Sequence, residues 1–393
     1  MLIPQNLIHK GLLYMSYSTA NTFDFQPLLT DEESFVSQMY SDDEKELSIY
    51  LDTAWSLMTP NERRMMTETA RTGRRGYNGF SIFAVLMTKM FYRCDTVRSV
   101  LQLFRKSWNL MHIAGLDSVP SEASMSRRIS ELMNIIDIGK IHERLVVSYY
   151  KDRLVHNTSL DSTIIDCHEK PLKKEKKQPS KRGRKRKGSD EELQLIARKE
   201  DEARQSLLLI QGDPHEALAS LEHGCSITGK KNSHGNMEWH IGYKAHMLVD
   251  DRGIPISCHV TGACVNDMKP AIPLIRIADS RCNFLYCLMD AGYCWEEIRK
   301  ATRSLGKVPV IDTKKDHRGN KGCLDPPKKD RYKARTTVER SNSELKACFL
   351  PDCLHSRGAK AILDICVSIL LLTMKRMRMV LLEEQRWARM RTA

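Results

Sequence analysis

The segment NFLYCLMDAGY, residues 283–293, decides the fold class. Its first seven residues form a nearly continuous apolar run, which is typical of a β-strand buried on both faces of a sheet. Asp290 follows this run directly, and the helical pattern WEEIRKATRSL comes after it. In open α/β sheets, ligands bind at the carboxyl ends of the strands. The segment therefore predicts an α/β fold with Asp290 at a ligand-binding edge.

Strand and helix patterns continue on both sides of this segment. LVHNTSLDSTIID (154–166) is β-branched and predicts a strand, in which Asp161 and Asp166 point to opposite faces because their offset is odd. We therefore expect only one of these two acids to serve a given site. Residues 237–265 predict a β-hairpin around DDRG, and DMKPAIPLIRIADS (267–280) predicts a crossover helix with Asp267 as its cap. KVPVIDT predicts a further strand.

The N-terminal part of the chain is predicted to be helical. Apolar residues recur at intervals of three and four across 61–150, and Pro120 with Ser121 can open a helix that carries Arg127 and Arg128. Such a helix can enter a DNA groove as in a helix-turn-helix, or it can be a packing helix with solvated arginines. Residues 1–60 carry nine acids against two lysines and predict an acidic arm or a small helical segment.

The charge distribution favours a polyanionic partner. The chain has a formal charge of +13, and residues 169–188 hold eleven Lys or Arg against two Glu. This run predicts a linker that neutralises DNA phosphates, with a merely solvated linker as the alternative. Its candidate DNA-binding residues are Lys181, Arg182, Arg184, Lys185, Arg186 and Lys187. We expect no signal peptide and no membrane span, since the apolar run 361–374 is too short and predicts a buried helix.

Three other kinds of site are not supported by their motifs. The twelve cysteines are scattered without a C-x-x-C pair, so we expect reduced thiols; Cys348, Cys353 and His355 lack a fourth ligand at ordered spacing for zinc. GCSITGKK (224–231) nearly matches a phosphate-binding loop, but Lys231 replaces the hydroxyl and no strand pattern precedes it. Zinc-protease and serine-hydrolase motifs are also missing from the sequence.

A second informative segment is RYKARTTVERSNSELK, residues 331–346. On a regular helix at about 100° per residue, one narrow face carries the side chains of Tyr332, Arg335, Glu339 and Lys346. These residues can form one wall of an active site. Alternatively, Arg335 and Glu339 form an ordinary surface ion pair of a few tenths of a kcal/mol.

Three acids on different elements are candidate catalytic residues and metal ligands: Asp161, Asp290 and Glu339. Hard carboxylate oxygens suit Mg²⁺, which is held by few carboxylates together with the phosphates of a substrate. Two such ions can activate the attacking oxygen and stabilise the leaving oxygen in phosphoryl transfer. Acids are common on protein surfaces, so the trio alone is a weak signal.

The combination of these motifs resembles DDE transposases of prokaryotic insertion sequences. The spacing Tyr332-x2-Arg335-x3-Glu339-x6-Lys346 matches the Y-R-E-K signature of that group. SLDSTII resembles its first-Asp strand, LMDAGY its second-Asp segment, and the segments WHIGYKAH and VTGACVND the hairpin between them. Together with the helical region upstream, the resemblance spans roughly residues 75–375.

The resemblance implies a fold and a chemistry. The fold is α/β: a ribonuclease-H-like mixed sheet with flanking helices, preceded by an all-helical N-terminal domain. Asp161, Asp290 and Glu339 would hold two Mg²⁺ ions, with Mn²⁺ as a substitute, and DNA phosphate would contact Tyr332, Arg335 and Lys346. Water would cleave the DNA at the ends of the element, and the freed 3′-hydroxyl would join target DNA. The partners would be terminal inverted repeats and target DNA, bound by a homodimer in the prokaryotic cytoplasm at the nucleoid.

The implied organisation has four parts. Residues 1–60 form the acidic segment, 61–150 the candidate DNA-binding domain, 151–380 the catalytic domain and 381–393 a C-terminal tail, with a basic linker and helical insertion at about 167–222. Two other functions stay open: a ribonuclease-H-like nuclease without strand transfer, and a catalytically idle DNA-binding protein derived from a transposase.

Overall fold

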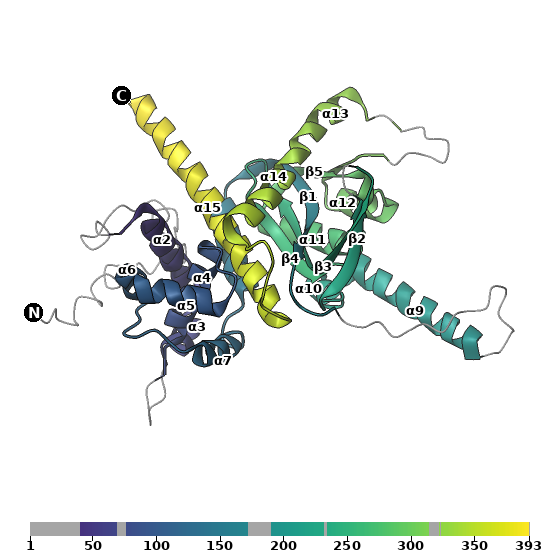
Figure 1. Ribbon diagram of the computed structural model, residues 1–393. Coiled ribbons are helices and arrows are strands. Elements are labelled where there is room, and N and C mark those ends of the chain that lie inside the picture. Colours follow the sequence, from purple (N-terminus) through teal and green to yellow (C-terminus); the bar gives the residue numbers. More distant parts are fainter. Residues whose placement is uncertain are drawn as a thin grey trace, which may run out of the picture.

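The computed structural model describes residues 40–68, 76–171, 190–231, 234–313, 322 and 324–392. Within these residues, one sheet is flanked by helices on both faces, and a group of helices lies beside it (Figure 1). This confirms the predicted fold class. The linker residues 172–189 and residues 1–39 lie outside the described residues.

The helices before the sheet begin at residues that suit helix starts. They are α2 (Asp42–Leu57), α3 (Pro60–Thr67), α4 (Gly79–Phe91), α5 (Val97–Lys106), α6 (Trp108–Ile113), α7 (Glu122–Leu132) and α8 (Ile138–Tyr150). Ser41 and Thr59 each form a capping box with a glutamate three residues on, and Ser121 caps α7 as predicted. α4 is apolar on nearly all sides and forms the buried centre of this group.

The sheet contains six strands among the described residues: β1 (Leu154–Asp166), β2 (Ser226–Lys231), β3 (Met237–Val249), β4 (Pro255–Gly262), β5 (Asn283–Met289) and β6 (Val308–Ile311). β1 is central, because it pairs antiparallel with β3 and parallel with β5. β4 pairs with β3, and β6 pairs with β5. The antiparallel hairpin beside parallel strands gives the mixed sheet that the sequence predicts.

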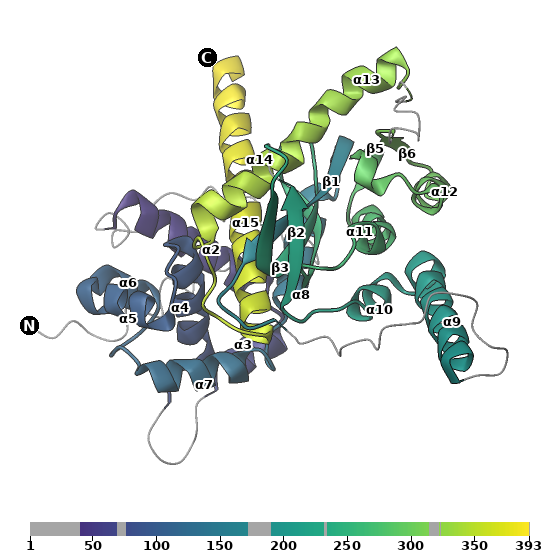
Figure 2. The ribbon, with the colours of Figure 1, turned by 45° about the vertical axis from the view of Figure 1, so that its right-hand side comes forward.

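Helices cover both faces of this sheet (Figure 2). On one face lie α10 (Pro214–Ala219), α11 (Met268–Arg281) and α12 (Glu296–Ser304), joined by α9 (Asp190–Gln211) at the periphery. On the other face, α14 (Thr336–Glu344) packs on β1 and β3, and α15 (Ala359–Thr392) packs on β4. The predicted helices at 267–280 and 361–374 are confirmed by α11 and α15.

α15 joins the sheet to the N-terminal helices. It contacts α4 and α8 as well as β4. Lys89 of α4 and Asp364 of α15 form an ion pair whose two side chains are each 3% exposed. The helix runs without a break to Thr392, so the segment predicted as a C-terminal tail continues α15.

The segment 331–346 departs from the regular helix assumed for it. α13 (Pro326–Tyr332) is followed by a 3-10 turn, η4 (Lys333–Arg335), before α14 begins, and a π-helical segment, η5 (Leu345–Phe349), follows α14. The spacing of 100° per residue assumed for the whole segment therefore does not apply to Tyr332 and Lys346. It applies between Arg335, the residue before α14, and Glu339.

β2 is a strand that the sequence patterns do not predict. Its sequence SITGKK contains a glycine and two lysines and resembles part of a phosphate-binding loop. It pairs antiparallel with the first half of β3 and forms an edge of the sheet, so only one of its sides has a strand partner.

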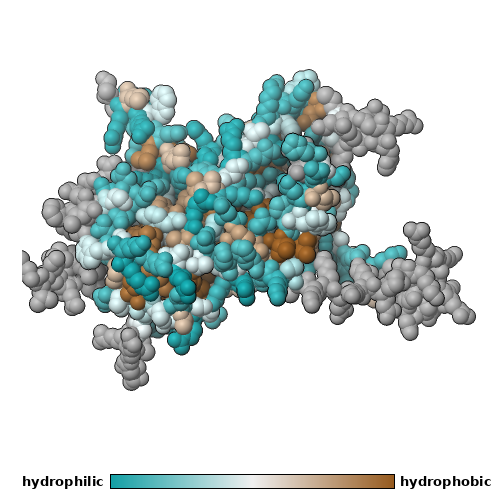
Figure 3. Space-filling model, in the orientation of Figure 1, coloured by the Kyte–Doolittle hydropathy of each residue, from teal (hydrophilic) through white to brown (hydrophobic). Residues whose placement is uncertain are grey.

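None of the helices in the described ranges is long and apolar enough to cross a membrane. The face in Figure 3 is mainly hydrophilic, with small separate hydrophobic patches.

Candidate active site

Asp161 and Asp290 lie side by side on neighbouring strands. In the parallel pair of β1 with β5, Leu160 aligns with Met289, so the next residue on each strand is one of these acids. The Asp290 carboxylate is oriented by the backbone, because its Oδ1 accepts a hydrogen bond of 2.8 Å from the Gly292 amide. A Cβ at position 292 would lie 2.8 Å from the same oxygen, which explains the glycine.

The electrostatics of Asp161 indicate a surplus of negative charge. The pKa of this carboxyl is raised to about 6, mainly by burial and also by the nearby Asp290 and Asp267 carboxylates, while the Ser162 amide and Arg335 act in the lowering direction. A half-buried carboxylate among like charges is stabilised by a bound cation. The residues at this position therefore suit a divalent cation.

Glu339 is held by Arg335. The Arg335 guanidinium donates to Glu339 Oε1, and the arginine side chain is 17% exposed while the glutamate is 49% exposed. Burial alone lowers the pKa of Arg335, but the charges of Glu339, Tyr332, Asp161 and Asp290 raise it overall. The surface ion pair considered from the sequence does form, and its arginine also faces the two strand acids.

The three acids are near one another without forming a closed cluster. Among the residues that the structure describes, they are not a group whose ligand atoms all lie within 4.8 Å of one another. Arg335 serves as the counter-charge in this arrangement. If Glu339 also bound a cation held by Asp161 and Asp290, its carboxylate would have to leave Arg335.

The structure places the two other residues of the signature differently. The Tyr332 ring centroid is 5.9 Å from Arg335 Cζ, and burial raises the pKa of Tyr332, with Asp290 and Glu339 adding to the effect. Lys346 lies farther along β1. Burial lowers its pKa, and its electrostatic neighbours are Asp166 and Lys230. Tyr332 therefore lies near the acids, whereas the charged neighbours of Lys346 are on β1 and β2.

Sequence reasoning missed Asn342. Its Nδ2 donates to Asp161 Oδ2 at 3.2 Å, it is buried, and its Oδ1 has no hydrogen-bond partner among the described residues. The signal was available, because Asn342 follows Glu339 by three positions and so faces the same way on a helix. It connects α14 directly to the acid on β1.

The structure also corrects the role that the sequence predicts for Asp267. It was predicted to cap α11, but its side chain makes no cap hydrogen bond. Instead Oδ1 accepts a bond of 2.8 Å from Lys244 Nζ and lies 3.9 Å from His246 Nδ1. His246 is fully buried, which lowers its pKa to about 3 and keeps it neutral. Asp267 thus belongs to the acidic environment of Asp161 and Asp290.

The candidate DNA-binding residues of the helical region lie on α7. Arg128 is engaged within the protein, because it pairs with Glu131 and donates to the Tyr77 carbonyl oxygen. Arg127 is exposed, and its Nε donates to the Ala123 carbonyl oxygen at 3.4 Å. The basic residues at 181–187 lie outside the described residues.

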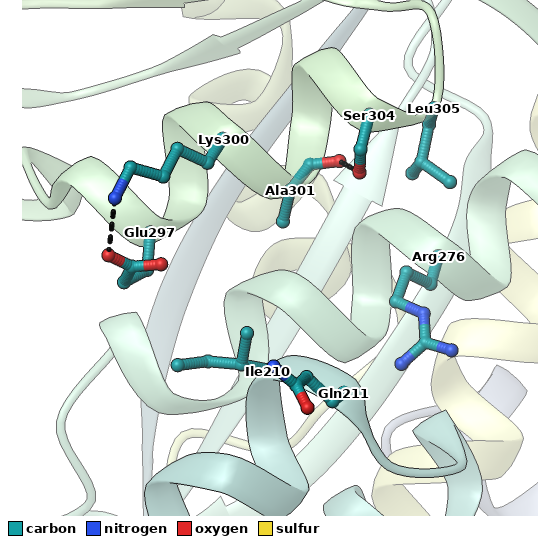
Figure 4. Close-up of a pocket in the computed structure, with 8 residues that line it drawn as sticks. All are labelled: Ile210, Gln211, Arg276, Glu297, Lys300, Ala301, Ser304 and Leu305. Atoms are coloured by element: carbon teal, nitrogen blue, oxygen red, sulfur yellow. Dashed lines mark hydrogen bonds and ion pairs between the residues drawn. The ribbon is translucent and has the colours of Figure 1, made fainter.

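A pocket of about 450 Å³ lies away from the acids, between α9, α11 and α12 (Figure 4). Lys300 and Glu297 form an ion pair at its rim, and Arg276 points into it from α11. It contains none of the three acids. This pocket is therefore separate from the candidate active site.

One carboxylate lies within the central strand β1, a second directly follows β5, and a third is on a helix packed against β1. These features define an α/β protein whose site suits phosphate chemistry. Residues 218–374 match the family model described as "Transposase DDE domain". This match contains Asp290 and Glu339 and begins after Asp161. The match covers less than half of the 393 residues, and within it the chain is similar to transposase DDE domains.

The chain is also similar to a solved structure described as "Cryo-EM structure of piggyBac transposase synaptic complex with hairpin DNA". The TM-score is 0.46 at 10% identity, over 90% of this chain and 78% of that one. At that level the likeness carries no functional argument. No curated protein matches the chain.

Proposed function

We propose that the protein is a DDE transposase, a polynucleotidyl transferase that cleaves DNA at the ends of an insertion sequence and joins the 3′-hydroxyl to target DNA. The observation that carries the proposal is the convergence of Asp161, Asp290 and the Arg335–Glu339 pair at one edge of the sheet. The family match over residues 218–374 supports the same activity. The domain boundaries given from the sequence stay predictions.

The proposed roles follow from charge and position. Asp161, Asp290 and Glu339 would hold Mg²⁺ ions, or Mn²⁺ in their place, and these ions would supply charge stabilisation in phosphoryl transfer. Arg335, once released from Glu339, can bind a DNA phosphate, and Tyr332 can contact the backbone beside it. Asn342 holds the Asp161 carboxylate in place. Two DNA ends would be brought together by a homodimer.

An excision assay tests this function. A plasmid carries a marker between the DNA segments that flank the coding region, and purified protein is added with Mg²⁺. We expect excision of the marker and its joining to target DNA with a short direct duplication. Cleavage without joining would favour the nuclease alternative. Binding without cleavage would favour the idle DNA-binding protein.

The pKa of Asp161 leads to a prediction for cation binding. Because this pKa is about 6 instead of 3.8, the carboxylate is ionised only above about pH 6, and protonation below that value opposes a cation. The same shift makes the contribution of Asp161 to folding stability fall as the pH rises from about 4 through about 6. Calorimetric Mn²⁺ titrations should show affinity falling below pH 6, and Asp161→Asn should remove that dependence. An affinity that stays constant down to pH 4 would contradict the assignment.

Arg335 should have opposite effects on cation binding and on DNA cleavage. Arg335→Gln removes a positive charge and frees Glu339, so Mn²⁺ should bind more tightly by about 1 kcal/mol, roughly fivefold, in the absence of DNA. Cleavage should fall, because the guanidinium no longer binds a DNA phosphate. Arg340→Gln is the matched control, since this exposed arginine on the same helix bonds only Thr336 among the described residues. Weaker Mn²⁺ binding in Arg335→Gln would contradict the competition.

The basic linker should affect the salt dependence of DNA binding. Replacing residues 172–188 by an uncharged Gly/Ser segment of equal length removes ten of the eleven basic residues in the run. If the run neutralises phosphates, the slope of log K against log salt should become shallower by about 0.9 for each phosphate that is no longer neutralised. Fluorescence anisotropy with a DNA duplex measures the slope. An unchanged slope would identify the run as a spacer.

A further inference from the structure

A group of metal-ligating side chains lies just beyond the C-terminal end of β1, away from Asp161 in the strand's interior. Cys167 and Glu169 directly follow β1, and Cys225 directly precedes β2. Their ligand atoms all lie within 4.8 Å of one another. Both thiols are free and buried, at 6% and 1% exposure. Six residues of extended chain, about 20 Å, separate Cys167 from Asp161, so this group is distinct from the candidate active site.

The distance between the two sulfurs suits a shared metal ion. Cys167 Sγ lies 3.4 Å from Cys225 Sγ. Two thiolates bound to one tetrahedral Zn²⁺ at about 2.3 Å lie about 3.8 Å apart, whereas a disulfide brings its sulfurs to about 2.0 Å. The observed spacing is a few tenths of an ångström from the first arrangement. Soft thiolate ligands favour zinc over the hard cations that suit the acid site.

The carboxylate of Glu169 is held in the way that metal-bound carboxylates are held. Its Oε2 accepts a bond of 2.6 Å from the Tyr243 hydroxyl and one of 2.8 Å from the Gly358 amide. Both bonds fall on the same oxygen, so Oε1 can serve as the ligand atom. Hydrogen bonds of this kind orient a ligand and are a regular feature of protein metal sites.

A fourth ligand is close by. Leu354 bridges to Cys167, because its amide donates to the Asp166 carbonyl oxygen at 2.9 Å and its own carbonyl oxygen accepts from the His168 amide at 2.9 Å. Cys353 immediately precedes it. Cys353 is half-buried, and its sulfur is not one of the ligand atoms that lie within 4.8 Å of one another, so its side chain would have to move closer to bind the same ion. Cys353 is accordingly the candidate for the fourth position, with water as the other ligand that can fill it.

We propose that Cys167, Glu169 and Cys225 bind one structural Zn²⁺ ion, with Cys353 as the candidate fourth ligand. The ion would tie the end of β1 to the start of β2 and to the segment that leads into α15. The sequence analysis did not predict a zinc site, because the cysteines show no C-x-x-C pair or other regular ligand spacing. The ligands instead come from positions 58 residues apart and meet only through the fold.

Metal content provides the first test. Full-length protein, purified without added metal, should contain one zinc per chain by elemental mass spectrometry. Cys225→Ser should lose the metal, while Cys94→Ser, a half-buried cysteine in the helical region, should keep it. A chelator should lower the melting temperature of wild-type protein and leave that of Cys225→Ser unchanged. Wild-type protein without zinc, whose melting temperature does not respond to added Zn²⁺, would overturn the proposal.

Cobalt substitution keeps the test informative if Cys225→Ser does not fold. Wild-type protein loaded with Co²⁺ should show a thiolate charge-transfer band whose intensity corresponds to two or three thiolates, three if Cys353 is a ligand. Glu169→Gln should weaken Co²⁺ binding and preserve the band. Absence of the band, or a Cys167–Cys225 disulfide in protein whose thiols were blocked at lysis, would refute the metal site. Neither readout depends on transposase activity, so failure of the proposed function would leave this test intact.

Discussion

Asp290→Asn will abolish metal-dependent DNA cleavage while DNA binding persists. The substitution keeps the size of the side chain and its bond to the Gly292 amide, but it removes a negative charge next to Asp161. Loss of a metal ligand in phosphoryl transfer should cost about 4 kcal/mol of transition-state stabilisation, which corresponds to roughly 10³-fold in rate. Single-turnover cleavage of a labelled DNA end measures the rate, and anisotropy measures binding.

The control for this experiment is Asp152→Asn, an identical change at an exposed acid before β1. It should retain wild-type cleavage and binding. Cleavage by Asp290→Asn within a few-fold of the wild-type rate would remove Asp290 from the metal site. The excision assay would then still decide separately whether the protein is a transposase, so the two conclusions do not depend on one result.

The second large effect concerns the ion pair between α4 and α15. Lys89→Ala should destabilise the protein by about 3–5 kcal/mol, because it leaves the Asp364 carboxylate buried without its partner. Denaturant unfolding, followed by fluorescence and circular dichroism, measures the loss.

A double variant separates the charge effect from packing. Lys89→Met combined with Asp364→Leu replaces the pair by apolar side chains and should recover most of the stability. If the double variant is as unstable as Lys89→Ala, the loss comes from packing and the ion-pair explanation fails. If Lys89→Ala unfolds at the same denaturant concentration as wild type, the pair contributes nothing at this position.

The fold class could be predicted because its signals are local. The apolar run of β5 and the β-branched run of β1 each specify a strand without help from the rest of the chain, and the acids follow from their positions in those runs. β2 escaped prediction because an exposed edge strand needs little apolar sequence. The segment with Gly229, Lys230 and Lys231 forms a strand because it pairs with β3.

The site could be predicted only in part, for a similar reason. Arg335 and Glu339 are four residues apart on one helix, so their contact follows from local geometry. The 3-10 turn before α14 and the π-helical segment after it have no signal in the sequence patterns, and Lys346 has Asp166 and Lys230 as its electrostatic neighbours. The contact between Lys244 and Asp267 joins β3 to the start of α11, which are distant in the sequence. The rules for helix caps consider only neighbouring residues, so they predict a cap bond for Asp267 and miss Lys244.

The continuous α15 has a mechanical consequence. At 1.5 Å per residue its 34 residues form a rigid rod about 50 Å long. Its buried part packs against the helical region on one side and the sheet on the other, and its last residues are exposed. If the helical region binds a DNA end, as the sequence predicts, α15 fixes the distance from that contact to the acids. Inserting half a helical turn of DNA between a recognised sequence and its cleavage point would turn the cleavage point away from the acids and reduce cleavage. Inserting a full turn would turn it back toward the acids and restore cleavage.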